Sequence, residues 1–303
     1  MLGIVAVALI LRRAKILNSE HGDLFAKVVL NVTLPALIFH SLYHAKIEAR
    51  LFGLVGIMIA AQLTCYLLAY ATGRVLKLSK GKLGALMLTS AFGSSGLLGY
   101  ALIAQAFPGN SEAMTAAAMI SEMAVAPLVF TVGVVTAIHF GNTGSQAKAG
   151  LKSILKFLRS PVFIALTAGL ICSLVGMPKA TGVVKVFFNG LETVASANTF
   201  LAAMIVGLLL NYQSLRSAAG VIAAACLIKL IIQPVLVWLP TTIFDVSSLH
   251  QQVLVIEAAM PAMTLSVVFA KAYGCDAKST SVSLLATNVA SVITLIGVNS
   301  ALL

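Results

Sequence analysis

Two long apolar runs of the sequence carry helix-breaking residues near their middle. Glycine lowers the cost of unwinding a helix, whereas proline removes a backbone donor and clashes with the preceding turn. A helix that restarts after such a break presents unpaired amide groups, which favour an anion. Taken singly, each break also fits a glycine packing face or a proline kink, but two breaks in corresponding runs favour a binding site. The breaks lie in residues 92–99 and 257–264, with Gly93, Gly96, Gly99 and Pro261 as the helix breakers.

Polar and small residues near the breaks are the candidates for contacting a bound substrate. Two asparagines in other apolar runs join them, because a buried asparagine must find hydrogen-bond partners. Asn31 and Asn198 could face a substrate carboxylate from opposite sides or bond between packed helices, and both interpretations stay open. The predicted substrate-binding residues are Asn31, Ser94, Ser95, Gly96, Asn198, Pro261 and Ala262.

Ionisable side chains inside the apolar runs form a second set of candidates, because a charge within a membrane is costly and marks function. Lys229 could attract an anion or form an ion pair with Glu122 or Glu257. Either glutamate could bind a coupling proton or sodium ion, or could be a hydrogen-bonded packing residue. Asn288 corresponds to Glu122 in the second half of the chain. Beyond such an ion, the sequence predicts no cofactor and no metal site.

The composition identifies the surroundings in which these residues act. Of 303 residues, 60% are hydrophobic and 10% are charged, whereas soluble domains carry about 25% charged residues. The apolar runs are long, as in membrane helices, and do not alternate as in an outer-membrane barrel. The net charge of +11 comes from short Lys and Arg clusters between the runs, so nucleic-acid binding is not indicated. No HExxH, P-loop or nucleophile-elbow pattern is present, and an enzyme is not predicted.

The sequence predicts an all-α polytopic membrane protein. A transmembrane helix needs about 20 predominantly apolar residues, and ten such runs are present. The first run is short, so either the bilayer is thinned there or the chain starts upstream of Met1. Loops after the odd-numbered runs hold fourteen Lys and Arg residues and the other loops hold four, which predicts a cytoplasmic first set and both termini outside. The runs cover residues 1–11, 24–44, 51–73, 83–107, 113–140, 161–177, 192–211, 217–243, 253–272 and 281–303.

A polar, basic segment over residues 141–160 divides the ten runs into two sets of five. An odd number of spans in each half forces the halves into opposite orientations, as in many transporters. We therefore predict a first five-helix repeat over residues 1–140, a cytoplasmic linker over 141–160, and a second, inverted five-helix repeat over 161–303. The two broken runs, the fourth and the ninth, then occupy corresponding positions.

Three segments resemble signatures of the auxin efflux carrier family. Residues 31–39, NVTLPALIF, are similar to its N-x-x-L-P-A-L-hydrophobic-F motif. Residues 92–107 resemble its G-N-x-G-F-x-G-x-P stretch followed by F-G, and residues 258–274 resemble its A-x-M-P…A…Y-G segment. Ser94 and Ala101 stand where the family has asparagine and proline. The resemblance covers the whole chain.

The resemblance implies ten helices in two inverted repeats, with helices four and nine discontinuous and crossing each other. It also implies a scaffold of helices one, two, six and seven, through which a homodimer forms, and a moving domain built from the other helices. We therefore expect a secondary active transporter of the compact prokaryotic type. Such a protein carries small organic anions across the cell membrane by alternating access, and bacterial members of the family are associated with dicarboxylates such as malonate and malate.

Two alternative functions stay open. A sodium-coupled symporter of the bile-acid type shares the crossing-helix plan, and Glu257, one helical turn before Pro261, fits it. An ion channel or a membrane-embedded sensor would show flux without saturation, or no flux.

Overall fold

The computed structural model describes residues 2–18, 20–44, 51–141, 158–175, 182–209, 218–244 and 246–302 of the chain. Across these residues the regular structure is helical, with one isolated β-bridge and no strand. The prediction of an all-α protein is therefore confirmed. Most of the predicted linker 141–160, and the ends of the predicted runs 161–177 and 192–211, lie outside the described residues.

Helices lie on every one of the predicted apolar runs, and several contain π-helical turns, labelled η. The first half contains α1 (Leu2–Arg13), α2 (His21–Val28), η1 (Val29–Thr33), α3 (Leu34–His44), α4 (Phe52–Val75), α5 (Lys80–Ala91), η3 (Ser95–Gly99), α6 (Tyr100–Ala106), α7 (Ser111–Met119), η4 (Ile120–Val125), α8 (Ala126–Leu128), η5 (Val129–Gly133) and α9 (Val134–Phe140). The second half contains α11 (Pro161–Val175), α12 (Gly182–Leu209), α14 (Ala219–Leu227), η6 (Ile228–Ile232), α15 (Gln233–Ile243), α16 (Ser248–Ala258), α17 (Leu265–Tyr273) and α18 (Ala277–Leu302).

Six helical stretches in the described ranges are long and apolar enough to cross a membrane. They correspond to the second, third, fifth, seventh, eighth and tenth predicted runs, which confirms a membrane protein with multiple apolar helices. Of the other runs, the first and sixth carry the shorter helices α1 and α11, and the fourth and ninth are each divided. The six stretches are His21–His40, Phe52–Val75, Ser111–Phe140, Lys185–Leu209, Ala219–Ile243 and Ala277–Val298. The inverted relation of the two halves stays a prediction.

The two divided runs cross each other at their breaks. One break separates α5 from η3 and the other separates α16 from α17. Ser94 N donates to Pro261 O over 2.9 Å, and Met263 N donates to Phe92 O over 3.0 Å. These two bonds flank an antiparallel bridge between Gly93 and Ala262. Each unwound segment thus satisfies backbone groups of the other, which is what a break inside a bilayer requires.

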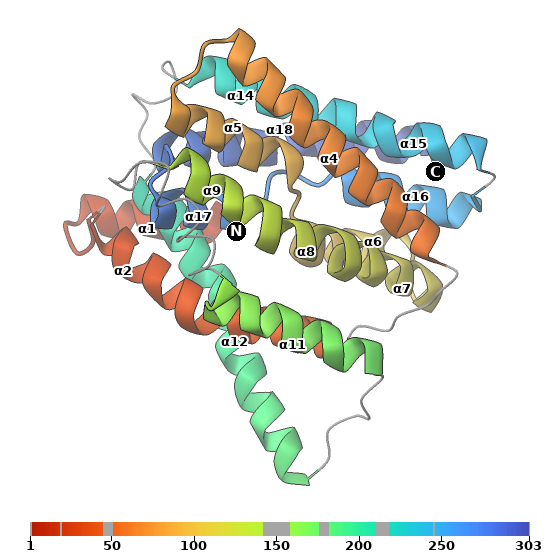
Figure 1. Cartoon of the computed structure of the whole chain (residues 1–303), viewed down its shortest axis with the longest axis horizontal. Helices are drawn as coiled ribbons and strands as arrows, with labels where there is room; N and C mark the ends of the chain where they lie inside the picture. The colour runs from red at the N-terminus through yellow and green to blue at the C-terminus, as the bar shows by residue number, and fades with distance from the viewer. Residues whose placement is uncertain are drawn as a thin grey trace.

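The helices fall into two groups that pack mainly within themselves. In one group α11 packs on α3, α1 packs on α12, and α12 packs on α3. In the other, α4 packs on α5, α14 packs on α5 and α18, and α15 packs on α16. Figure 1 shows α11 and α12 at the lower side and α4, α14, α15 and α18 at the upper side. The first group holds the helices of runs one, two, six and seven, and the second holds the others.

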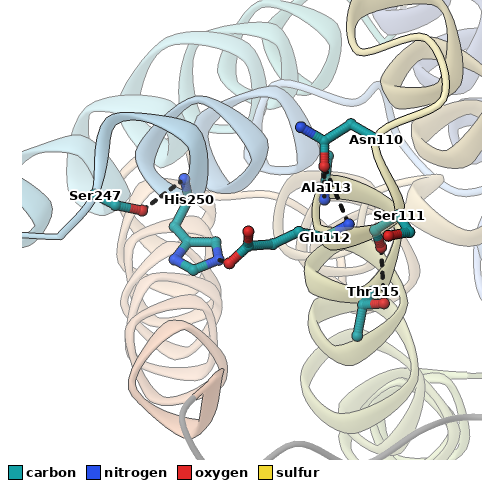
Figure 2. Close-up of polar contacts among 7 residues, drawn as sticks. All are labelled: Asn110, Ser111, Glu112, Ala113, Thr115, Ser247 and His250. Carbon is teal, nitrogen blue, oxygen red and sulfur yellow. Dashed lines mark hydrogen bonds and ion pairs between the residues drawn. The ribbon is translucent and has the colours of Figure 1, made fainter.

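The beginnings of α7 and α16 are fixed and joined by side chains (Figure 2). Asn110 caps α7, because its Oδ1 atom accepts hydrogen bonds of 3.0 Å from the backbone amides of Glu112 and Ala113. Ser247 Oγ accepts a hydrogen bond of 3.4 Å from the amide of His250 in α16. His250 Nε2 lies 3.4 Å from Glu112 Oε1, so a side-chain contact joins the two helices there.

Replacing Asn110 with alanine is expected to lower the free energy of unfolding by about 1 kcal/mol, because two amides at the start of α7 lose their acceptor. The melting temperature in detergent should fall by about 2–4 °C. Ser111→Ala is the matched control, since that neighbouring side chain is exposed. This variant should have the same melting temperature as the unchanged protein. Equal melting temperatures for the two variants would contradict the capping role.

Candidate functional site

Two glycines of the first break leave room for buried ionisable side chains. A Cβ atom on Gly93 would lie 2.8 Å from Lys229 Nζ and 2.9 Å from its Cε. A Cβ atom on Gly99 would overlap the carboxylate of Glu257. The glycines therefore have a second role besides permitting the break, since any larger residue would displace Lys229 or Glu257.

Lys229 holds the end of a broken helix. It lies in η6 and is completely buried. Its Nζ atom donates to Gln233 Oε1 over 2.6 Å and to the carbonyl oxygen of Ala258 over 2.7 Å. Ala258 is the last residue of α16, where a cation compensates the unpaired carbonyls and the negative end of the helix dipole.

The ion pairs considered for Lys229 from the sequence are not formed. Among the described residues, no ion pair joins it to Glu122 or Glu257, and the ion pairs found there lie elsewhere. Glu257 is 1% exposed, and neither of its carboxylate oxygens has a hydrogen-bond partner in the described structure. A charged carboxylate without partners is costly in a protein interior. Glu257 is therefore a buried acid whose two oxygens could still accept a hydrogen bond.

A cavity of about 140 Å³ lies beside the crossing. Its wall combines the starts of both restarting helices, part of η4, and residues of α3 and α12. The first turn of a helix leaves amides without intrahelical partners, so two such turns border one cavity. The polar and break-forming residues in its wall are Ser94, Ser95, Gly96, Ser121, Glu122, Asn198, Thr199, Met263 and Thr264.

Polar contacts connect the start of η3 to Glu122. Ser95 Oγ donates to Ser121 Oγ over 3.2 Å, and Ser121 Oγ lies 3.5 Å from Glu122 Oε1. Tyr100 OH donates to the same carboxylate oxygen over 2.7 Å. Gly96 lies close to this chain, since a Cβ atom there would be 3.1 Å from Ser121 Oγ. An acid thus faces the cavity in which the sequence predicted an anion.

The two asparagines that could face one substrate from opposite sides lie in different surroundings. Asn198 is buried and lines the cavity, and its Oδ1 atom accepts a hydrogen bond of 3.1 Å from Thr33 Oγ1. Asn31 is exposed, donates to the carbonyl oxygen of Lys27 over 2.8 Å, and lines a different groove between α3 and α12. The reason is helical geometry: residues two apart point about 200° away from each other. Thr33, two residues after Asn31, takes the inward position.

The second break contributes different residues to the cavity from those predicted. Pro261 and Ala262 are buried in the crossing and do not line the cavity. The segment after the second break contributes Met263, Thr264 and Leu265 to the wall instead. Ala262 N donates to Thr287 Oγ1 over 3.3 Å. The neighbouring Asn288 donates back to the carbonyl oxygen of Leu284, within its own helix. Thr287 of α18 therefore contacts the crossing through its hydroxyl group, whereas the side-chain amide of Asn288 bonds within α18.

The sequence as a whole matches a known family of membrane proteins. The model of the family described as "Membrane transport protein" matches residues 1–149 and 145–298. The chain belongs to this family, that of the auxin efflux carriers. The membership confirms the resemblance found in residues 31–39, 92–107 and 258–274, and it makes the chain a member of a family of membrane transporters.

Similar proteins of this family occur in archaea and bacteria. The chain is 28% identical over 299 residues to an uncharacterized transporter of Methanothermobacter thermautotrophicus, covering 97% of this chain and 94% of the relative. It is 25% identical over 284 residues to the uncharacterized transporter MJ1031 of Methanocaldococcus jannaschii, covering 92% and 89%. It is 23% identical over 292 residues to the uncharacterized transporter YfdV of Escherichia coli K12, covering 93% and 89%.

Proposed function

We propose that this family member is a secondary active transporter that carries small mono- or dicarboxylates across the cell membrane. The observation that carries the proposal is the cavity beside the crossing, because the amide ends of two restarting helices border it and favour an anion. Its volume of about 140 Å³ is small compared with the roughly 300–1,000 Å³ of pockets for drug-sized ligands. A small carboxylate suits this space.

Alternating access fits the two groups of helices. The cavity lies between them, since the crossing and η4 belong to one group and α3 and α12 to the other. In this mechanism the group that carries the crossing moves against a scaffold of α1–α3, α11 and α12, which also forms the homodimer. The loops after the odd-numbered runs face the cytoplasm, and both termini lie outside.

A thermal-shift screen of the purified protein tests the proposal. Lactate, malonate, malate and succinate are each added with and without sodium. A bound ligand raises the melting temperature, because it stabilises the folded protein by an amount that grows with the logarithm of its concentration over Kd. We expect at least one of these carboxylates to stabilise the protein. A shift that requires sodium would favour the bile-acid type of symporter, for which the unpartnered Glu257 is the supporting observation. A flat response to all four would contradict the proposal.

An ion pair between the two groups gives a test of movement. Lys271 Nζ in α17 lies 3.0 Å from Asp23 Oδ1 in α2. A variant with Asp23→Cys and Lys271→Cys, in which Cys172 and Cys226 are replaced by alanine, is expected to lose carboxylate uptake into liposomes when cross-linked by a short bismaleimide. We expect this loss because the proposed alternating access moves α17 away from α2, and the cross-link prevents that movement.

The matched control cross-links α7 to α16 inside one group, through Glu112→Cys and His250→Cys, whose native side chains lie 3.4 Å apart. This link should leave uptake unchanged. Undiminished uptake through the linked Asp23 and Lys271 positions would contradict the proposed movement.

A further inference from the structure

Glu122 places a carboxyl group in the wall of the cavity that we propose for an anion. It is 7% exposed, lies in η4, and lines the cavity with Ser94, Ser95 and Gly96. Two negative charges about 4 Å apart, in surroundings of effective dielectric constant about 20, weaken binding about a thousandfold. A charged Glu122 would therefore prevent tight binding of a carboxylate in this cavity.

The helices around Glu122 supply no cation to offset this repulsion within the described structure. Lys229 bonds to neutral acceptors and forms no ion pair with Glu122. From α16, Glu257 is a second buried acid and supplies no positive charge. On α4, the Cys65 thiol donates to the carbonyl oxygen of Ile228. The Tyr66 hydroxyl bonds to the hydroxyl of Thr136. Tyr100, a neutral donor, contacts Glu122 directly.

We propose that Glu122 takes up a proton when the anion binds, so that the protein moves a proton together with each carboxylate. The inference rests on the proposed function. On the side where the anion enters, an O–H bond of a hydronium ion breaks, and its proton adds to the Glu122 oxygen that Tyr100 does not contact. On the other side the carboxyl O–H bond breaks, the proton returns to water as hydronium, and the anion leaves with it. No other bond forms or breaks, and one negative charge of the pair is removed while both are bound.

Glu122 is a better site for this proton than Glu257, although both are buried acids. Glu122 lines the cavity, whereas Glu257 is not part of its wall and lies against Gly99, the last residue of η3. A group that faces the anion directly feels its charge most strongly. The protonation of Glu122 is therefore the one that anion binding controls.

Malonate binding measured at two pH values tests the inference. The Kd of malonate is determined by thermal shift at about pH 7 and about pH 9, where malonate itself is a dianion. In the unchanged protein we expect the Kd to rise with pH, by up to about tenfold per pH unit, because one proton is bound with each anion. Glu122→Gln imitates the protonated acid and should bind malonate with the same Kd at both pH values.

Glu112→Gln is the matched control, because it makes the same substitution in the same continuous helical stretch, at the end that contacts His250 and away from the cavity. Its Kd should depend on pH as in the unchanged protein. Tyr100→Phe is the second variant, and it keeps the test informative if Glu122→Gln does not fold. The hydrogen bond from Tyr100 favours the ionised carboxylate, so its removal should move the pH at which affinity is half lost to a higher value.

The outcomes separate the inference from the proposed function. No stabilisation of the unchanged protein by malonate, lactate, malate or succinate at either pH overturns the proposed function, and with it this inference. Malonate binding that is independent of pH, or pH dependence that persists in Glu122→Gln, overturns the inference alone. Loss of the pH dependence in Glu257→Gln with its retention in Glu122→Gln would assign the proton to Glu257 and also overturn it.

Discussion

Replacing Gly93 with alanine is expected to lower the free energy of unfolding by about 2–4 kcal/mol and to abolish carboxylate binding. The new Cβ atom would lie 2.8 Å from Lys229 Nζ and 2.9 Å from its Cε. Lys229 cannot move away freely, because it bonds to Gln233 over 2.6 Å and to the carbonyl of Ala258 over 2.7 Å. A hydrogen bond of a charged group contributes about 1.5–3 kcal/mol, and the displacement breaks at least one.

The effect on binding follows from the place of Gly93 in the crossing. It forms the bridge to Ala262, between the bonds that hold Ser94 to Pro261 and Met263 to Phe92. If the crossing separates, the starts of the two helices no longer border one cavity. Thermal unfolding and malonate binding in detergent measure both effects.

Gly56→Ala is the control for this prediction. It places the same substitution in a membrane helix, α4, at a position where a new Cβ atom meets nothing within 4 Å. This variant should be as stable as the unchanged protein or more stable by about 0.4–1 kcal/mol, because alanine loses less backbone entropy on folding. If Gly93→Ala has the same free energy of unfolding as Gly56→Ala, Lys229 is not held in place and the prediction is wrong.

The breaks themselves could be predicted from the sequence, because glycine and proline act locally. α16 ends at Ala258, three residues before Pro261, and proline disfavours helix in the residue before it. The glycines between residues 92 and 99 mark the other break in the same way. Which side chains occupy the space beside those glycines could not be predicted, because this depends on how close two distant helices approach.

The role of Lys229 shows this difference in a single residue. Its cost inside an apolar run marked it as functional from the sequence alone. The sequence left open an ion pair or an anion contact, and the structure instead brings its ammonium to the end of α16. That partner is a backbone carbonyl, and a backbone carbonyl has no signature in the sequence. Helix ends buried in a membrane protein therefore deserve consideration as partners for isolated lysines.

The assignment of cavity residues from the sequence was limited by helical phase. Ser94, Ser95, Gly96 and Asn198, four of the candidates for substrate binding, line the cavity, whereas Asn31 lines another groove. A shift of two residues in one helix, from Asn31 to Thr33, changes the inward position. Thr33 had a recognisable signal, since it is a polar residue within the apolar run, but a threonine can bond to its own helix and attracts less attention than an asparagine.

Replacing Gly99 with alanine is expected to lower the free energy of unfolding by about 1–3 kcal/mol, through overpacking in a closed interior. The added Cβ atom would overlap the carboxylate of Glu257, which is 1% exposed. The carboxylate has no hydrogen bonds to lose in the described structure, so the cost should be smaller than for Gly93. Unfolding in detergent measures it, with Gly53→Ala in open space as the control.

A double variant shows whether this overlap is the cause. Glu257→Ala removes the atoms that the new Cβ atom would meet, so Gly99→Ala should cost little in its presence. The two substitutions should then be non-additive by about 0.5–3 kcal/mol, as for residues in direct contact. Strictly additive effects would mean that Glu257 does not lie against Gly99, and the second role assigned to that glycine would be lost. Non-additivity would instead show that Gly99 leaves space for the buried acid Glu257. A glycine that served only helix–helix packing would not show this dependence on Glu257.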